Sequence, residues 1–205
     1  MSLGENITNA VYVLNKTYQG IEKLMDATDR ISAEEGFTSV SPASPRFLRW
    51  KSDQNAWGWF ISSFIKVYQH QEAPRCASGT GLRKDSIYGM EISLDSVALP
   101  KIILSRTDYP DLEQANKLSS SDHWRFHWPV QEGTKQIKFQ ISSEEFDGKS
   151  YKKSVPILPE TKKNYWNIEK ALFIEESLAD IKSDNIKSKV FDGFRYLSRI
   201  QVENK

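Results

Sequence analysis

The stretch Trp57-Gly-Trp-Phe-Ile-Ser-Ser-Phe-Ile-Lys-Val-Tyr68 decides the fold class that we predict for this chain. Its apolar side chains fall on both alternating sets of positions, a pattern that is typical of a strand covered on both faces of a sheet. We therefore expect residues 57–68 to form a strand near the centre of a sheet, with Trp59 buried as a core anchor.

Shorter segments with apolar–polar alternation follow this strand. Residues 88–94 alternate strictly and predict a half-buried strand, and residues 101–106 predict another. The turn-forming sequence Asp108-Tyr-Pro-Asp111 ends the second of these strands, and Glu145-Phe-Asp-Gly148 predicts a further turn. Because the links between consecutive strands are short, we expect antiparallel pairing.

The alternation continues in the aromatic part of the chain. Residues 124–128 predict one strand and residues 137–141 predict the next, with residues 131–134 as a hairpin-length connection between them. Residues 151–157 predict the last strand. Pro156 within it indicates an edge position, because proline has no N–H group to donate within a sheet.

An amphipathic helix is predicted for residues 3–31, and Gly36 is expected to end it. Its apolar residues repeat with the 4-3-4-3-4 spacing of a heptad seam: Ile7, Val11, Leu14, Tyr18, Ile21 and Met25. Val13 and Leu24 widen this stripe, which favours a helix that packs on its own sheet. The alternative is a homodimer that uses residues 3–31 or the C-terminal helices, since a two-fold dimer is the commonest closed assembly.

The C-terminal part of the chain returns to the helical period. Apolar spacing predicts two helices, around residues 168–181 and 186–197. The predicted fold class is therefore α+β, an antiparallel sheet flanked by an N-terminal amphipathic helix and two C-terminal helices. We expect one domain over residues 1–205, made of the N-terminal helix (1–36), a sheet of about five to seven strands (46–158) and the C-terminal helices (164–202).

Composition and charge exclude several classes of protein. The 205 residues hold 28 Lys and Arg against 27 Asp and Glu, a balance that excludes a protein coating a polyanion. Residues 1–40 hold 3 basic and 6 acidic side chains, whereas residues 149–205 hold 12 basic and 8 acidic, so the two ends favour docking on each other or on a partner. The single cysteine, Cys76, excludes a disulfide framework and a Cys-rich zinc site.

The N-terminal region indicates the compartment. It has neither a basic segment followed by an apolar core nor an apolar run of the ~20 residues that a membrane span needs. We therefore expect a cytoplasmic protein with no membrane partner. The motifs indicate no cofactor and no metal ion.

The sequence Asp122-His-Trp-Arg-Phe-His127 holds the densest set of chemical side chains. On a strand, His123, Arg125 and His127 share one face, and the two histidines lie about 13 Å apart, too far to share a metal ion. On a helix the same pair could share one, but the aromatic alternation favours a strand. This face is then either a solvated surface or an anion-binding one, through Arg125 and His127.

Two alternatives to a plain interaction protein remain. A metal-dependent phosphoesterase or nuclease would use Glu91, Arg125, His127 and Lys138 on the polar face of the sheet, because Asp122 and Gln136-Ile-Lys138 faintly resemble a nuclease pattern. A single-stranded nucleic-acid binder would use the interleaved Arg46, Arg49 and Trp50 together with the basic C-terminal quarter of the chain, and His123 is a further candidate binding residue. Such aromatic residues are also common in cores, with arginine stems covering apolar surface.

The glycine-rich loop at residues 77–84 has a similar ambiguity. It could hold a phosphate through its N–H groups, but it lacks the P-loop spacing and fits a hairpin loop better. Arg75 beside Cys76 could lower the pKa of the thiol, but a lone cysteine in such a chain is more often incidental. Because no catalytic motif stands out, we favour a protein that acts by binding another protein or its own copy, and we leave open whether it is an enzyme.

Overall fold

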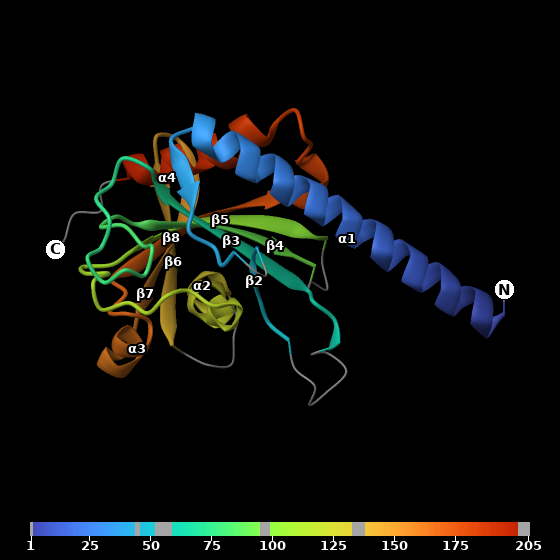
Figure 1. Ribbon diagram of the computed structural model, residues 1–205, viewed down its shortest axis with the longest axis horizontal. Helices are drawn as coiled ribbons and strands as arrows, with labels where there is room; N and C mark the ends of the chain where they lie inside the picture. The colour runs from blue at the N-terminus through green and yellow to red at the C-terminus, as the bar shows by residue number, and fades with distance from the viewer. Residues whose placement is uncertain (1, 44–45, 52–58, 95–98, 133–137, 201–205) are drawn as a thin grey trace.

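The computed structural model describes residues 2–43, 46–51, 59–94, 99–132 and 138–200 (Figure 1). It confirms the α+β class, with a long N-terminal helix, one antiparallel sheet and helical segments near the C-terminus. In chain order the elements are α1 (Leu3–Glu34), β1 (Phe37–Ser39), β2 (Leu48–Arg49), β3 (Ser63–His70), β4 (Ile87–Ser93), β5 (Lys101–Asp108), η2 (Ser120–Asp122), α2 (His123–His127), η3 (Trp128–Val130), β6 (Phe139–Phe146), β7 (Lys149–Pro156), α3 (Pro159–Asn164), β8 (Lys170–Ser177), η4 (Leu178–Asp180), η5 (Lys187–Phe191) and α4 (Asp192–Arg199).

The strands follow the order β1-β3-β4-β5-β8-β7-β6. The short strand β2 also pairs with β3, at residues 64–65, whereas β1 pairs with residues 68–70 of β3. The last strand in the chain, β8, lies between β5 and β7, so β5 and not β3 occupies the middle of the sheet. The expected central position of the strand at residues 57–68 was therefore wrong for its described part, whereas residues 57 and 58 lie outside the described residues. The sheet also extends beyond residues 46–158, because β1 precedes that range and β8 follows it.

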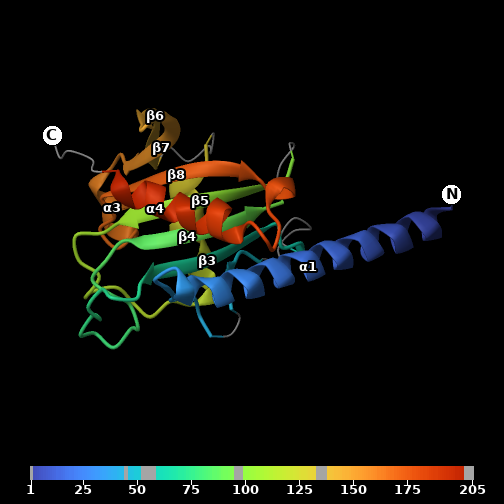
Figure 2. The same cartoon turned by 90° about the horizontal axis from the view of Figure 1, so that it is seen from above.

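Both faces of β3, β4 and β5 are covered. One face packs on α1 and on the helical segment η5–α4, which lie next to each other across the strands in Figure 2. The other face packs on α2 and on the long loops that precede it. The side chains on the first face include Tyr68, Met90, Ile92, Ile102, Leu104 and Phe194; those on the second include Ile65, Val67, Leu82, Ile87 and Phe126.

This double covering corrects one sequence-based expectation. All seven residues of β4 are buried, so the strand predicted as half-buried is enclosed on both sides. Its polar positions, Glu91 and Ser93, are therefore inside the protein. Buried polar groups need hydrogen-bond partners, and those of Glu91 are Ser63 and His127 on the second face.

Two segments differ in secondary structure from the prediction. Residues 123–127 form a helix and not a strand, and Trp124 packs against Tyr165 with ring centroids 4.8 Å apart. The segment around residues 168–181 is mostly the strand β8, in which Ala171, Leu172 and Phe173 are all buried. A short, continuous run of apolar residues fits a buried helix as well as a strand that is covered on both faces, so the sequence alone does not distinguish the two.

Three smaller expectations also change. Trp59 precedes β3 and is 71% exposed, so it is not a core anchor.

Pro156 does not lie in an edge strand, because β7 lies between β8 and β6. The proline is tolerated there because β7 pairs with β8 only at residues 152–154. The hairpin expected at residues 131–134 falls partly outside the described residues, as does the start of the strand expected at 137–141, and the segment before the hairpin is helical.

The predicted turn at residues 145–148 is confirmed. Asp147 and Gly148 join β6 to β7 with φ angles of 52° and 70°, the left-handed pair that a two-residue hairpin requires. The helix α1 also ends as expected, since Gly36 has a φ of 81°. No helix in the described part of the chain combines the length and the apolar character that crossing a membrane requires.

The C-terminal helical segment lies very close to the sheet. A side chain at Gly193 would place its Cβ 2.5 Å from Leu104 Cδ1, so only glycine allows α4 to approach β5 this closely. Glu35, at the end of α1, accepts hydrogen bonds from Lys187 and Arg195. The helix α1 and the segment η5–α4, which cover the same face of the sheet, are therefore joined by charged side chains as well as by apolar packing.

We expect Phe194→Ala to lower the free energy of unfolding by about 3–5 kcal/mol, because this fully buried ring fills space between α4 and the sheet. Trp59→Ala, which truncates an exposed ring, should lower it by less than about 1 kcal/mol. Urea unfolding followed by circular dichroism measures both. Equal losses in the two variants would contradict this assignment of the core.

We expect Glu35→Gln to lower the free energy of unfolding by about 1–3 kcal/mol, because it removes the charge that Lys187 and Arg195 contact. Hydrogen bonds from Lys187 and Arg195 lower the pKa of Glu35 below its ordinary value of 4.5. The stabilisation is therefore complete above that value and is lost as the pH falls through the lowered pKa. Urea unfolding at pH 7 and near pH 3 measures this, and a difference between wild type and variant that persists at low pH would contradict it.

Candidate functional sites

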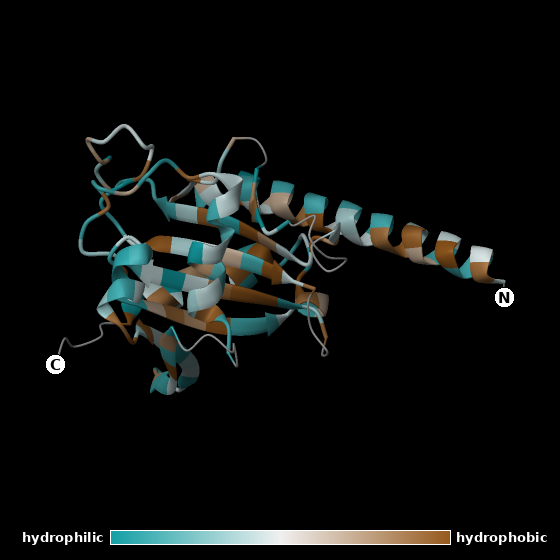
Figure 3. Cartoon of the chain, turned by 90° about the horizontal axis from the view of Figure 1, so that it is seen from below, coloured by the Kyte–Doolittle hydropathy of each residue, from teal (hydrophilic) through white to brown (hydrophobic). Residues whose placement is uncertain are grey.

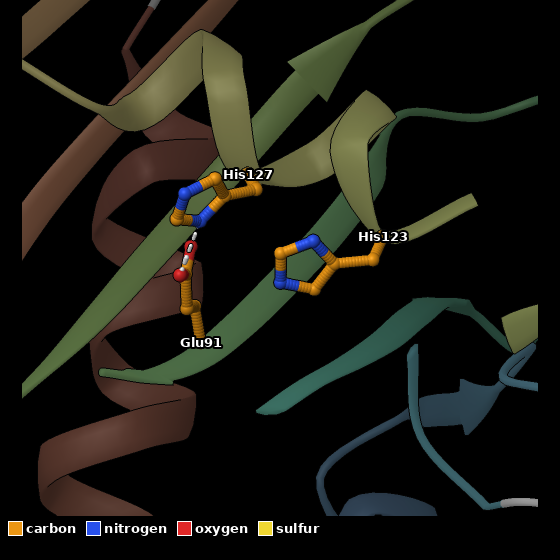
Figure 4. Close-up of side chains that lie close together, drawn as sticks. All are labelled: Glu91, His123 and His127. Atoms are coloured by element: carbon orange, nitrogen blue, oxygen red, sulfur yellow. Dashed lines mark hydrogen bonds and ion pairs between the residues drawn. The ribbon is translucent and has the colours of Figure 1, made fainter. Parts of the chain in front are cut away.

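The short helix α2 brings two histidines together. His123 and His127 lie one helical turn apart, and their rings stack with centroids separated by 4.8 Å and planes inclined by 30°. The separation of about 13 Å expected for a strand was therefore wrong. Both rings turn toward the second face of the sheet, where Glu91 of β4 meets them (Figure 4).

Four side chains from three elements form one hydrogen-bonded cluster, which we call the polar centre: Ser63, Glu91, His123 and His127. Glu91 Oε1 lies 2.6 Å from His127 Nδ1 and accepts a hydrogen bond of 2.6 Å from Ser63 Oγ. His123 Nε2 lies 2.8 Å from the same Ser63 Oγ. Because Ile65 is the register partner of Glu91, Ser63 is its diagonal neighbour on the same face.

The polar centre is almost closed to solvent. Glu91 is 3% exposed and His123 is 4% exposed, whereas the His127 side chain keeps 19% of its surface accessible. Burial alone would raise the pKa of Glu91, but the charge of His127 and the hydrogen bonds of His127 and Ser63 hold it below its ordinary value. Burial, and then the nearby charge of His127, lowers the pKa of His123 to about 4, so its ring is neutral at pH 7.

One atom of the polar centre lacks a partner. Glu91 Oε2 is buried and makes no hydrogen bond to any residue that the structure describes, whereas Oε1 receives two close polar contacts. At the rim, Gln131 Nε2 lies 3.4 Å from His127 Nδ1. The arrangement has a buried carboxylate, two imidazoles and one accessible side, which is a chemistry suited to holding a cation.

The other residues proposed for a catalytic face lie elsewhere. Arg125 stacks on Trp124 and Trp166, with its guanidinium carbon 4.2 Å and 4.7 Å from their ring centroids, and pairs with Asp122. Lys138 lies just before β6, where its carbonyl accepts a hydrogen bond from Ile157. The structure therefore brings Glu91, His123 and His127 together and keeps Arg125 stacked on the tryptophans.

Two of the residues proposed for nucleic-acid binding, Arg46 and Arg49, border a cavity of about 440 Å³ beneath α1, whereas His123 belongs to the polar centre. Arg46 pairs with Asp26 at 2.5 Å and with Glu22 at 3.6 Å, and Arg49 lies over the ring of Phe47. Asp26 and Glu22 offset the cations, so this cavity offers little net attraction to phosphates. Trp50, which directly follows β2, does not line the cavity and is 46% exposed.

Cys76 is not activated by its neighbour Arg75. It is 7% exposed, and its N–H donates to the carbonyl of Leu82 across a hairpin loop. Burial, followed by the negative charge of Glu113, raises the pKa of the thiol, which is opposite to the lowering expected from Arg75. A buried thiol with a raised pKa is a weak nucleophile at neutral pH.

The second candidate site is an exposed helix face. The N-terminal half of α1 projects beyond the sheet, and hydrophobic residues recur along it (Figures 1 and 3). Leu3, Ile7 and Val11 are 77%, 56% and 52% exposed, and Leu14 continues the same face. We call these four residues the free stripe.

Comparison with protein-family models, with curated protein sequences and with solved structures gives no match for this chain. The features of the chain that bear on its function are therefore the polar centre and the free stripe.

We expect Ser63→Ala to lower the free energy of unfolding by about 1–3 kcal/mol, because it removes the hydroxyl that joins Glu91 to His123 and leaves both buried groups short of a partner. Ser143→Ala on β6 is the matched control, because this serine is exposed. Urea unfolding at pH 7 measures both. A loss no larger than that of the control would show that the polar centre does not stabilise the fold.

Proposed function

We propose that this protein acts by protein–protein interaction and that its first partner is a second copy of the chain, bound through the free stripe. The supporting observation is the length of α1. A helix of 32 residues is about 48 Å long, whereas the eight-residue strands beneath it span about 26 Å. One part of α1 therefore packs on the sheet, and the other part extends past the end of the sheet.

The free stripe lies on the same side of α1 as the residues that pack on the sheet. Ile21 and Met25 are each 5% exposed in the core, and the heptad spacing carries their face back through Tyr18 to Ile7. Tyr18 marks the boundary, since its hydroxyl bonds to the backbone of Ile61. N-terminal to it, an apolar face of the same character has none of the described strands beneath it.

The chemistry of the free stripe favours another helix as its partner. A heptad repeat presents side chains as knobs that fit between those of a neighbouring helix. In an antiparallel two-fold pairing centred between Ala10 and Val11, Ile7 faces Leu14 and Leu3 faces Tyr18, whereas Val11 faces the small side chain of Ala10 at the centre. The stripe is self-complementary in this arrangement, as a two-fold interface requires.

Charge does not favour an anionic surface as the partner. Between residues 3 and 18 the charged side chains are Glu5 and Lys16, one of each sign. Glu5 closes the capping box with Ser2, and Lys16 lies 5.6 Å from the ring centre of Tyr12, away from the stripe. Helices that bind anionic membranes carry many lysines and arginines, and a nucleic-acid surface would need them as well.

The C-terminal helices, the other expected dimer surface, are used within the chain. Phe191, Phe194 and Leu197 are each fully buried in the chain's own core. This leaves the N-terminal half of α1 as the surface that best fits a dimer.

We expect the wild-type chain to sediment at twice its mass of 23.6 kDa at concentrations of tens of micromolar. Ile7→Glu should weaken the dimer by at least about 100-fold, because two-fold symmetry places the new charge in the interface twice. Tyr12→Glu is the matched control, since Tyr12 is 61% exposed but lies on the opposite side of the helix. Sedimentation equilibrium measures all three.

A wild-type chain that remains at 23.6 kDa up to about 100 µM contradicts this proposal. So does a dimer that Ile7→Glu and Tyr12→Glu weaken equally. Circular dichroism of both variants confirms that each is folded before the comparison is made.

A further inference from the structure

We propose that Glu91, His123 and His127 bind one divalent transition-metal ion. One donor atom from each of these residues lies within 4.8 Å of the other two. Two imidazoles and a carboxylate form the ligand set that Zn²⁺ and its first-row neighbours take in proteins. This site is separate from the free stripe and does not depend on the proposed dimer.

The local fold places these donors. The histidines stand one turn apart on α2, so both rings leave the same side of the helix. Glu91 comes from the interior of β4, a strand buried along its whole length. Two ligands from a helix and one from a strand of the sheet give a set whose backbone positions are held by the core and by hydrogen bonds.

The distances are close to those that an ion needs. Ligand distances of about 2.0–2.2 Å place neighbouring donor atoms roughly 3–3.5 Å apart. The three donors lie within 4.8 Å, so rotation of the imidazole rings about their side-chain bonds is enough to close the set.

The second observation is the unpartnered oxygen of Glu91. Oε1 is in contact with both Ser63 and His127, whereas Oε2 is buried and has no hydrogen-bond partner among the described residues. Leaving a buried carboxylate oxygen without a partner is unfavourable. A purely structural role for the polar centre accounts for Oε1 but not for Oε2, and a bound cation supplies the missing interaction.

An ion can reach the site from one side. The His127 side chain is 19% exposed, and Gln131 lies beside it at the rim. The remaining coordination position then falls to water or to the amide oxygen of Gln131. A three-residue set with a further open position is the arrangement found in catalytic rather than structural zinc sites.

The test is titration of the untagged full chain with ZnCl₂, after treatment with a chelator and desalting, followed by isothermal calorimetry. We expect one ion per chain with a Kd of about 1 µM or tighter. Co²⁺ added in place of zinc should give visible absorption bands that report nitrogen and oxygen ligands. Ile7→Glu should bind zinc as the wild type does.

Variants assign the ligands. His127→Gln and Glu91→Gln should each weaken zinc binding by at least about 100-fold. His70→Gln is the matched control, because His70 pairs with Asp85 outside the polar centre and should leave the affinity unchanged. Cys76→Ser, which removes the thiol, should bind zinc as the wild type does.

Absence of zinc and cobalt binding by the wild type would overturn the proposal. Retained affinity in Glu91→Gln would also overturn it, as would equal losses in His127→Gln and His70→Gln or a loss confined to Cys76→Ser. Glu91→Gln keeps the shape of the side chain, so it decides the outcome if circular dichroism shows that His127→Gln does not fold.

Discussion

The burial of β3, β4 and β5 on both faces is the constraint on which the rest of this structure depends. A strand covered on one side can turn its polar residues to water, but β4 has no solvent face and must place Glu91 inside the protein. The protein meets this requirement with Ser63 on the neighbouring strand and with two histidines on α2. The polar centre thus follows from the layer architecture, and the shortage of partners at Glu91 Oε2 is what makes it a candidate metal site.

The same architecture explains the exposed part of α1. The first face of the sheet is shared between α1 and the segment η5–α4, and Gly193 lets α4 lie directly on Leu104. Asp29 contributes a polar connection from α1, since it pairs with the buried Lys66 at 2.6 Å and accepts a hydrogen bond from Tyr68. The contacts of Asp29 involve the C-terminal half of α1, and within the described part of the chain the N-terminal half projects with its apolar face exposed.

Long or strongly patterned elements could be predicted from the sequence. The 4-3-4-3-4 spacing from Ile7 to Met25 predicted α1, and the turn residues Asp147 and Gly148 predicted the β6–β7 connection. Such local signals depend on one face of a helix or on one turn, and both are encoded by neighbouring residues. The spacing could not tell which part of α1 lies over the sheet, because that depends on the size of the sheet.

The polar centre could be predicted only in part. Glu91, His123 and His127 were all candidates, but the histidines were placed on a strand because five residues are too few to show a helical period. In the helix α2, Trp124 packs against Tyr165, a residue distant in sequence, and this contact could not be read from the local pattern. Ser63 was missed because its role arises from strand register, and β8 was missed because its apolar run has no period. The histidine spacing of i, i+4 was the one signal that could have indicated the shared site.

The central claim is that one face of α1 serves two partners, the chain's own sheet and a second copy. Hydrogen–deuterium exchange of the wild type at about 1 µM and about 100 µM tests it directly, because amide protection reports local opening. The account predicts that amides from Gly4 to Thr17 exchange more slowly at the higher concentration, while those from Ile21 to Glu34 exchange at the same slow rate in both. Exchange near the N-terminus that is independent of concentration would contradict it.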